Sequence, residues 1–274
     1  MWVRPHAGNL LSILGNLAFR LDSKAVFEAP PAQATPSAPA ASPFLCRSDL
    51  ENNLLRQGLD ECLNGHLLTE RELESTLQEV LASPLREGAD IWLFAYGSLI
   101  WNPVLEYESR HVATVHGYHR SMCLWSRINR GTPQNPGVVL GLDRGGRCTG
   151  VVYRIRGELV EQELRLLWRR EMLLGSYSPR WVYATHGEQS FRALAFVVNR
   201  ERSGYAGRIP NQQLVDILCK ATGKLGPALE YLRLTVDGLA ANGIRDPQLL
   251  QLDALVRARL GESDPSAPRA SLQI

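Results

Sequence analysis

The pattern of apolar and polar positions predicts regular structure from about residue 69 onward. Residues 91–94 form an unbroken apolar run, Ile-Trp-Leu-Phe, which is rich in β-formers, too short to cross a membrane, and predicts a buried strand. Further alternating or apolar runs with turn residues between them predict strands at 112–125, 138–142, 148–155, 181–185 and 193–198. Several short strands with few long crossovers indicate a strongly curved, mostly antiparallel sheet or a small β-barrel.

Helical periodicity is confined to a few stretches. In TERELESTLQEVLAS, Thr69 and Glu72 have the spacing of a capping box and the apolar residues share one stripe, so an amphipathic helix is expected before the first strand. Four more helices are predicted at 159–174, 212–221, 228–241 and 247–260. The mixture indicates an α+β fold with helices flanking the curved sheet or barrel, and no internal repeat is visible.

Composition divides the chain into four parts. Residues 1–47 include PPAQATPSAPAASP, which cannot bury enough apolar surface to offset its ordering entropy, so a disordered Pro/Ala-rich extension is expected there. Residues 48–88 are expected to form a helical lead-in, 89–262 the main domain, and 263–274 a flexible tail. An apolar stretch after Arg4 has the outline of a secretory signal, but charged residues interrupt the approach to its AQA cleavage site.

The overall composition argues against several classes of partner. The 274 residues carry a formal net charge of +2, whereas nucleic-acid binders concentrate many Lys and Arg on one face. The five cysteines are scattered, odd in number and free of CxxC spacing, so no disulfide framework or zinc site is indicated. No apolar run approaches the ~18 residues of a membrane span. We therefore expect a cytoplasmic protein with no nucleic-acid or membrane partner.

The turn after the first strand is one candidate for a ligand site. Residues Tyr96-Gly97-Ser98 follow the strand directly. Glycine lets the backbone approach a ligand closely, and the amides of Gly97, Ser98 and Leu99 are placed to converge on an anion or a developing oxyanion. A Gly-Ser turn is also a common way simply to end a strand, so both interpretations remain open from these residues alone.

A carboxylate continues the apolar stripe of the predicted helix at 159–174. The stripe consists of large apolar residues: Val160, Leu164, Leu167 and Trp168. Three or four residues further on lies Glu171, and no Lys or Arg lies three or four positions from it. Burial would raise the pKa of this carboxylate and suit it to general acid–base catalysis. The alternative is a solvated acid at the helix end, or one paired with Arg169 or Arg170.

Read together, these stretches resemble the ChaC-like, glutathione-specific branch of the gamma-glutamylcyclotransferase family. The matching segments are IWLFAYGSLIWNP (91–103), HGYHRSMCLWS (116–126), RGTPQNPGVVLGLDRGGRCTGVVYRI (130–155), LWRREMLLGSYSPRW (167–181) and EYL (230–232). Their order and spacing are similar to the family over roughly residues 90–260. One departure is Ala228, where the family usually has an asparagine three residues before the tyrosine of its EYL-like segment.

The resemblance implies a compact barrel with flanking helices and a defined chemistry. The YGSL turn would be the substrate loop, formed by Ala95, Tyr96, Gly97, Ser98, Leu99 and Ile100. The catalytic acid would be Glu171. The implied reaction converts glutathione to 5-oxoproline and cysteinylglycine without a metal, nucleotide or other cofactor.

That reaction requires a proton carrier but no protein nucleophile, because the substrate's amine attacks its own gamma-carbonyl. Glu171 would take the proton from the ammonium group and return it to the leaving nitrogen. Arg130 either faces the carboxylates of glutathione or is solvated. Tyr231 either reaches the substrate or Glu171 through its hydroxyl or simply packs.

Other chemistries fit these residues less well. Ser98 lacks the glycine two residues later that GxSxG requires. Cys123 and His119 do not have the pattern of a dyad, and the neighbouring histidines lack matching carboxylate or cysteine spacing for a metal. Two competing functions remain: a cyclotransferase for other gamma-glutamyl amino acids or amines, and a non-catalytic binding or regulatory module. The sequence does not indicate an oligomeric state.

Overall fold

The computed structural model describes residues 44–57, 67–82 and 88–263. The disorder expected in the N-terminal extension therefore concerns residues that lie almost entirely outside the described ones, as does the flexible tail expected after residue 263. All described residues belong to one compact unit, Ala41–Ile274. None of the helices in the described part is long and apolar enough to cross a membrane.

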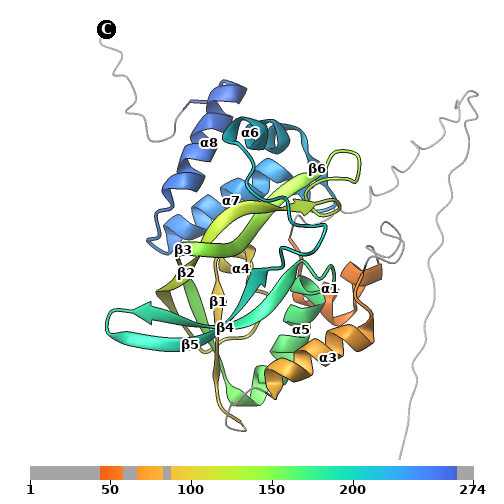
Figure 1. The fold of residues 1–274 in the computed structure, drawn as a ribbon, viewed down its shortest axis with the longest axis vertical. Coiled ribbons are helices and arrows are strands. Elements are labelled where there is room, and N and C mark those ends of the chain that lie inside the picture. The colour runs from red at the N-terminus through yellow and green to blue at the C-terminus, as the bar shows by residue number, and fades with distance from the viewer. Residues whose placement is uncertain (1–43, 58–66, 83–87, 264–274) are drawn as a thin grey trace, which may run out of the picture. The chain divides into compact units, whose positions relative to one another are not determined.

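Five strands close into a small barrel (Figure 1). They are β1 (Ile91–Ala95), β2 (Ser109–Ser126), β3 (Gly137–Ile155), β4 (Tyr177–His186) and β5 (Gln189–Val198). Their order around the barrel is β1-β3-β2-β4-β5, and the parallel pairing of β1 with β5 contributes to closure. The remaining long ladders are antiparallel. The predicted α+β fold with a strongly curved, mostly antiparallel sheet is confirmed.

Three strands begin earlier than predicted, β2 at Ser109, β4 at Tyr177 and β5 at Gln189, and two of the predicted strands are one. The runs at 138–142 and 148–155 belong to a single strand, β3, which pairs with β2 throughout its length. The polar DRGGR segment between them continues the ladder, because Gly145 and Gly146 adopt φ values of 99° and 72° that let the backbone twist within the hairpin. A register shift between His116 and Tyr118 accommodates the twist on β2.

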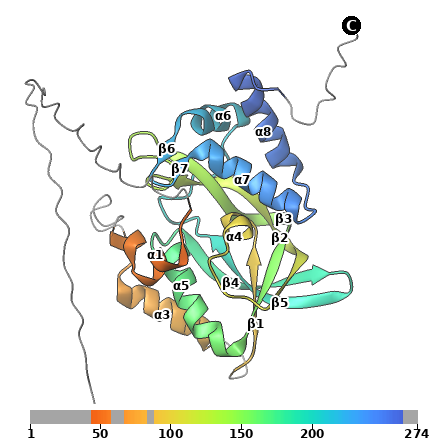
Figure 2. The ribbon, with the colours of Figure 1, turned by 180° about the vertical axis from the view of Figure 1, so that it is seen from behind.

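The helices lie on two sides of the barrel. Figures 1 and 2 show α1, α3 and α5 on one side and α6, α7 and α8 on the other. The helical elements are α1 (Arg47–Glu51), α3 (Glu70–Leu81), α4 (Ser98–Trp101), η1 (Gly157–Leu159), α5 (Val160–Glu171), α6 (Asn211–Lys220), α7 (Ala228–Ala241) and α8 (Pro247–Leu260). A two-stranded pair, β6 (Thr222–Gly223) and β7 (Gly226–Pro227), precedes α7.

The expected capping box starts α3. Thr69 Oγ1 accepts a hydrogen bond from the Glu72 amide at 3.2 Å, and the Thr69 amide donates to Glu72 Oε2 at 2.7 Å. These reciprocal bonds satisfy two backbone donors that would otherwise have no partner at the helix start. The amphipathic helix predicted ahead of the first strand is therefore confirmed.

The helix that carries the candidate acid is shorter than predicted. Its apolar stripe is buried, as expected, and packs into the barrel core through the contact of Trp168 with Phe196, whose ring centroids are 5.5 Å apart. Helix α5 ends at Glu171 rather than at residue 174, and Gly175 then turns the chain into β4 with φ of 61°. The acid is therefore the last residue of its helix.

Candidate active site

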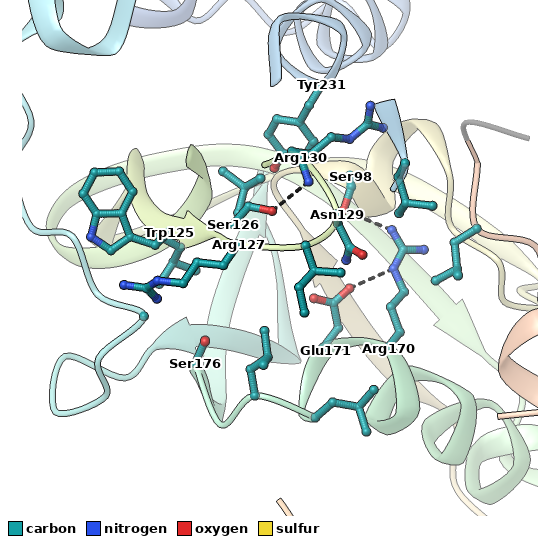
Figure 3. Close-up of a pocket in the computed structure, with 18 of the residues that line it drawn as sticks. Ser98, Trp125, Ser126, Arg127, Asn129, Arg130, Arg170, Glu171, Ser176 and Tyr231 are labelled. Atoms are coloured by element: carbon teal, nitrogen blue, oxygen red, sulfur yellow. Dashed lines mark hydrogen bonds and ion pairs between the residues drawn. The ribbon is translucent and has the colours of Figure 1, made fainter. Parts of the chain in front are cut away.

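A cavity of about 380 Å³ lies where the end of α5, the one-turn helix α4, the β2–β3 connection and α7 meet. Figure 3 shows side chains that line it, among them Ser98, Glu171 and Tyr231. Among the predicted site residues, four line this cavity: Ser98, Arg130, Glu171 and Tyr231. The topology thus brings together side chains from four separate parts of the sequence.

The other predicted residues of the turn do not line the cavity. The side chains of Ala95, Tyr96, Leu99 and Ile100 are buried in the core and do not line the cavity. Gly97 abuts α7: a β-carbon at this position would lie 3.3 Å from the Tyr231 hydroxyl. This close approach explains why the turn has a glycine there.

The Glu171 carboxylate faces the cavity from the C-terminal end of α5 (Figure 3). Its side chain is 12% exposed. Burial raises the pKa of this carboxyl above its ordinary value, and the charge and hydrogen bond of Arg170 only partly oppose that effect. A carboxyl with a raised pKa at the wall of a cavity is better suited than an ordinary one both to take and to give a proton.

Glu171 has a cationic partner on its own helix, contrary to the expectation based on helical spacing. Arg170 Nε lies 3.0 Å from Glu171 Oε1. The same guanidinium donates to the Asn102 carbonyl at 2.6 Å and to Ser98 Oγ at 3.0 Å. The pairing alternative considered from the sequence is thus realised, because the helix ends at the acid and lets the preceding side chain fold back. Arg170 connects the acid to the turn that contains Ser98.

Two tyrosine hydroxyls meet the backbone of Leu140 on β3. The Leu140 amide donates to Tyr231 Oη at 3.2 Å, and Tyr177 Oη donates to the Leu140 carbonyl at 3.3 Å. Burial raises the pKa of Tyr231 to about 12, so its hydroxyl stays protonated. That hydroxyl proton has no acceptor among the described residues, whereas the hydrogen of Tyr177 is already used. Tyr231 therefore has a donor left for a ligand, while its ring packs against Trp101.

Arg130 is buried rather than solvated. Its side chain is 3% exposed, and Nη1 donates to Glu230 Oε2 at 2.7 Å and to the Pro227 carbonyl at 3.3 Å. The contacts bind the RGTP segment to the start of α7, next to Tyr231. The loop is tight enough that a β-carbon at Gly131 would lie 2.0 Å from the Gly137 amide nitrogen.

A second buried arginine contacts the backbone of the turn after β1 and was not found from the sequence. Arg120 on β2 donates to the carbonyls of Tyr96 at 2.5 Å and Thr149 at 2.7 Å. It also pairs with Asp246 at 2.5 Å, the residue that caps α8. Alternation along β2 predicts that Arg120 points inward, but it gives no indication of these partners.

The surroundings of the other candidate catalytic groups do not suit them to catalysis. Burial raises the pKa of the Cys123 thiol to about 12, which leaves it an unreactive thiol. Ser98 Oγ accepts from Arg170, and no histidine lines the cavity in the described part of the chain. Within the same residues there is no group of three or more His, Cys, Asp or Glu placed to hold a metal ion. A Ser or Cys hydrolase site is absent from this cavity.

Comparison with known proteins identifies related sequences and a related fold. Residues 91–259 match the model of the ChaC-like protein family. The chain is 37% identical over 192 residues to the "Glutathione-specific gamma-glutamylcyclotransferase" of Escherichia coli, covering 70% of this chain and 83% of the relative. It is 35% identical over 173 residues to "Glutathione-specific gamma-glutamylcyclotransferase 1" of Mus musculus, covering 61% and 77% respectively.

Among solved structures, the fold is similar to a crystal structure of a yeast gamma-glutamyl cyclotransferase specific to glutathione. The TM-score is 0.58 at 22% sequence identity, over 62% of this chain and 96% of the yeast chain. At that identity the likeness establishes the barrel fold and nothing finer. The fold class expected from the sequence agrees with it.

Proposed function

The chain belongs to the ChaC-like protein family, and on that premise we propose that it is a glutathione-specific gamma-glutamylcyclotransferase. The observation that carries the proposal is the position of Glu171, a carboxylate with a raised pKa at the wall of the cavity. The names of its relatives in Escherichia coli and Mus musculus support glutathione as the substrate.

The proposed reaction needs one proton carrier. The alpha-ammonium group of glutathione gives a proton to Glu171, and the free amine attacks the gamma-carbonyl carbon of its own glutamyl residue. The new carbon–nitrogen bond closes a five-membered lactam as the bond to the cysteine nitrogen breaks. Glu171 returns its proton to that nitrogen, which leaves as an amine. Glu171, ionised again, then takes the second proton that the ring nitrogen loses as the lactam forms and passes it to the released amine, so the products are 5-oxoproline and cysteinylglycine. Holding the glutamyl chain in a near-cyclic conformation supplies much of the rate.

The raised pKa of Glu171 suits both halves of this shuttle. An ordinary carboxylate is a poor base toward an ammonium group, and an ordinary carboxylic acid is mostly ionised when the leaving nitrogen needs a proton. A value closer to neutrality improves both transfers, and such catalysis typically contributes ~10²- to 10⁴-fold in rate. Arg170 keeps the carboxylate pointed toward the substrate loop.

The remaining site residues would bind the glutamyl end. The amides of Gly97, Ser98 and Leu99 are proposed to hold the alpha-carboxylate or the oxyanion, within a loop whose other members are Ala95, Tyr96 and Ile100. Tyr231 supplies a neutral hydroxyl donor. Arg130 supplies positive potential at the cavity wall even though Glu230 partly neutralises it.

The proposed location is the cytoplasm, where glutathione is kept reduced. The four cysteines within the described residues are all free thiols, as expected of a reducing compartment. A metal or organic cofactor has no step to perform in the proposed reaction, because the shuttle moves only a proton.

The first experiment is direct. Purified protein is incubated with reduced glutathione, without added metal or nucleotide, and the products are identified by mass spectrometry. Equal amounts of 5-oxoproline and cysteinylglycine are expected from the wild type. Glu171→Gln should remain folded and bind glutathione, because the amide is nearly isosteric with the carboxylate. It should form neither product, because the amide cannot accept a proton and return it. Glu79→Gln, which removes an exposed carboxyl on α3, should match the wild type.

Two results would change the assignment. A higher kcat/KM for gamma-glutamyl-alanine than for glutathione would keep the chemistry and replace the substrate class with other gamma-glutamyl compounds. A folded wild type that binds glutathione without forming either product would favour the non-catalytic binding or regulatory module. Full activity in Glu171→Gln would show that Glu171 is not the proton carrier.

A further inference from the structure

The cavity has two ends that differ in chemistry. Near α1, the wall includes Leu45, Leu55 and Trp101, which are apolar. The opposite end, where Trp125 donates its amide to the Gly204 carbonyl at 2.8 Å, has polar side chains beside apolar ones such as Leu124, and we call it the polar end. This polar end is lined by Ser126, Arg127, Ser176 and Ser203. Figure 3 shows Trp125, Arg127 and Ser176 away from the Arg170–Glu171 pair.

The arginine at the polar end has unused binding capacity. The contacts of the Arg127 guanidinium are to the Ser203 carbonyl, at 3.5 Å from Nη1 and 3.4 Å from Nη2. Both distances exceed the ~2.7–3.2 Å of a good N–H···O hydrogen bond. No carboxylate among the described residues forms an ion pair with it. The N–H groups of the Arg127 guanidinium are therefore nearly all available to a ligand in the cavity.

The two other lining arginines are already engaged. Arg130 is paired with Glu230 at 2.7 Å, and Arg170 is paired with Glu171 at 3.0 Å. A ligand carboxylate that replaced either partner would break an existing ion pair. A carboxylate that reached Arg127 would break only the two long contacts to Ser203. Of the three cations that line the cavity in the described part of the chain, Arg127 is therefore the one that gains most from an incoming anion.

Glutathione has a carboxylate at the end away from its scissile bond. If its gamma-glutamyl end lies at Glu171, the cysteinylglycine half must extend along the cavity, and its terminal group is the glycine carboxylate. Two residues in extended conformation span at most ~7 Å. The end near α1 offers that carboxylate leucine and tryptophan side chains and the Asn102 amide, which already donates to the Leu45 carbonyl at 2.9 Å, so its charge would be left unpaired there. The polar end offers a guanidinium and hydroxyl groups.

We propose that Arg127 binds the glycine carboxylate of glutathione and makes this chain select a substrate with a terminal carboxylate two residues beyond the scissile bond. The assignment rests on the proposed function. Arg127 is a binding residue for the leaving half and takes no part in the proton transfer. The two-point attachment also orients the gamma-carbonyl, since the glutamyl end is held at the substrate loop and the glycine end at Arg127.

The test compares two substrates with and without the guanidinium. The substrates are glutathione and its glycinamide analogue, gamma-glutamylcysteinylglycinamide, which lacks only the terminal charge. Wild type should prefer glutathione by roughly tenfold in kcat/KM, mostly through KM, the size expected for one charge-assisted contact at a partly exposed site. Arg127→Met should lose that preference by weakening the reaction with glutathione while the glycinamide reaction stays unchanged. Arg127→Lys should keep part of it.

The control is Arg71→Met, which removes an exposed arginine from α3 and should leave both substrates unaffected. If Arg127→Met keeps the wild-type preference, or if wild type shows none, the inference is wrong while the cyclotransferase assignment stands. If wild type forms no product from either substrate, the proposed function fails. Binding of glutathione and of the glycinamide is then measured by calorimetry with Glu171→Gln and with Glu171→Gln/Arg127→Met, so that the carboxylate contact is tested without turnover. Equal affinity of these two proteins for glutathione would overturn the proposed contact.

Discussion

Arg170 Nε lies 3.0 Å from Glu171 Oε1, although the two residues are adjacent in the sequence. Side chains at successive positions of an α-helix point in different directions and do not normally meet. They meet here because α5 ends at Glu171 and the arginine is held back by the Asn102 carbonyl and Ser98 Oγ. The proposed proton shuttle is therefore oriented by the same guanidinium that fixes the start of α4.

This contact predicts how activity depends on pH. Glu171 must be ionised to accept the substrate's proton, so kcat/KM for glutathione should rise with pH through a pKa above that of an ordinary carboxyl. Arg170→Met removes the charge that lowers this pKa, so the rise should move to higher pH. Below its pKa, each unit of upward shift lowers the ionised fraction about tenfold. The measurement is the pH profile of kcat/KM.

Arg170→Lys serves as the control for that profile. It retains a positive charge near Glu171 but lacks the geometry to bond Asn102 and Ser98 together, so its profile should stay close to that of the wild type while its maximum rate falls. If Arg170→Met lowers kcat/KM at every pH without moving the pH at which it rises, the guanidinium positions site residues and does not set the pKa of Glu171.

Glu171 should also make folding stability depend on pH in a defined direction. Its pKa is raised in the folded state, so the folded protein binds the proton more tightly than the unfolded chain does. The stability that this proton provides is fully present below the pKa of the unfolded chain and is lost as pH rises through the folded value. The wild type should therefore lose stability relative to Glu171→Gln across that interval. Urea unfolding at a series of pH values measures the difference, and a constant difference would contradict the raised pKa.

The sequence alone was sufficient for the features that depend on periodicity. The capping box at Thr69, the buried first strand and the apolar stripe leading to Glu171 follow from local spacing, and the structure has each of them. The turn at Gly97 was also recognisable, because a glycine directly after a buried strand marks a close backbone approach. These features need no knowledge of distant partners.

Features that depend on distant partners were missed. Glu163 is fully buried on α5, one position before Leu164 of the apolar stripe, because Arg47 from 116 residues earlier pairs with it. Arg120 likewise has its carbonyl and carboxylate partners on other elements. Helical or strand spacing shows that a charge points inward, but it does not show which residue neutralises it. The partner of Glu171 was among the alternatives considered from the sequence, but spacing alone could not choose it, since the Arg170 contact depends on the helix ending at Glu171.

The two tyrosines on Leu140 allow a matched comparison of binding and packing. Tyr231→Phe and Tyr177→Phe each remove one hydrogen bond to the Leu140 backbone, so each should lower stability by about 1 kcal/mol. Only Tyr231 has a hydroxyl proton left for the substrate. Tyr231→Phe should therefore lower kcat/KM for glutathione by roughly tenfold or more, and Tyr177→Phe should change it much less. Equal losses of activity in the two variants would remove Tyr231 from substrate binding.

The segment before the family match provides the last prediction, because it forms part of the cavity wall. Leu45 and Leu55 line the cavity, and Arg47 between them binds both oxygens of Glu163 at 2.8 Å. The Asn102 side chain also donates to the Leu45 carbonyl at 2.9 Å. Although the family model matches only residues 91–259, the site therefore depends on residues from 45 onward.

Arg47→Met should lower both stability and activity. It leaves the Glu163 charge buried without its partner, which costs about 3 kcal/mol, the lower end of the range for a broken buried pair because Arg47 is itself 32% exposed. Arg47→Met/Glu163→Gln removes the buried charge as well and should recover most of that stability in urea unfolding. Activity should stay low in the double variant. Residues 45–55 still lack the Arg47–Glu163 contact that holds them in place, so Leu45 and Leu55 no longer form the apolar wall of the cavity. Recovery of full activity together with stability would show that the segment only stabilises the fold.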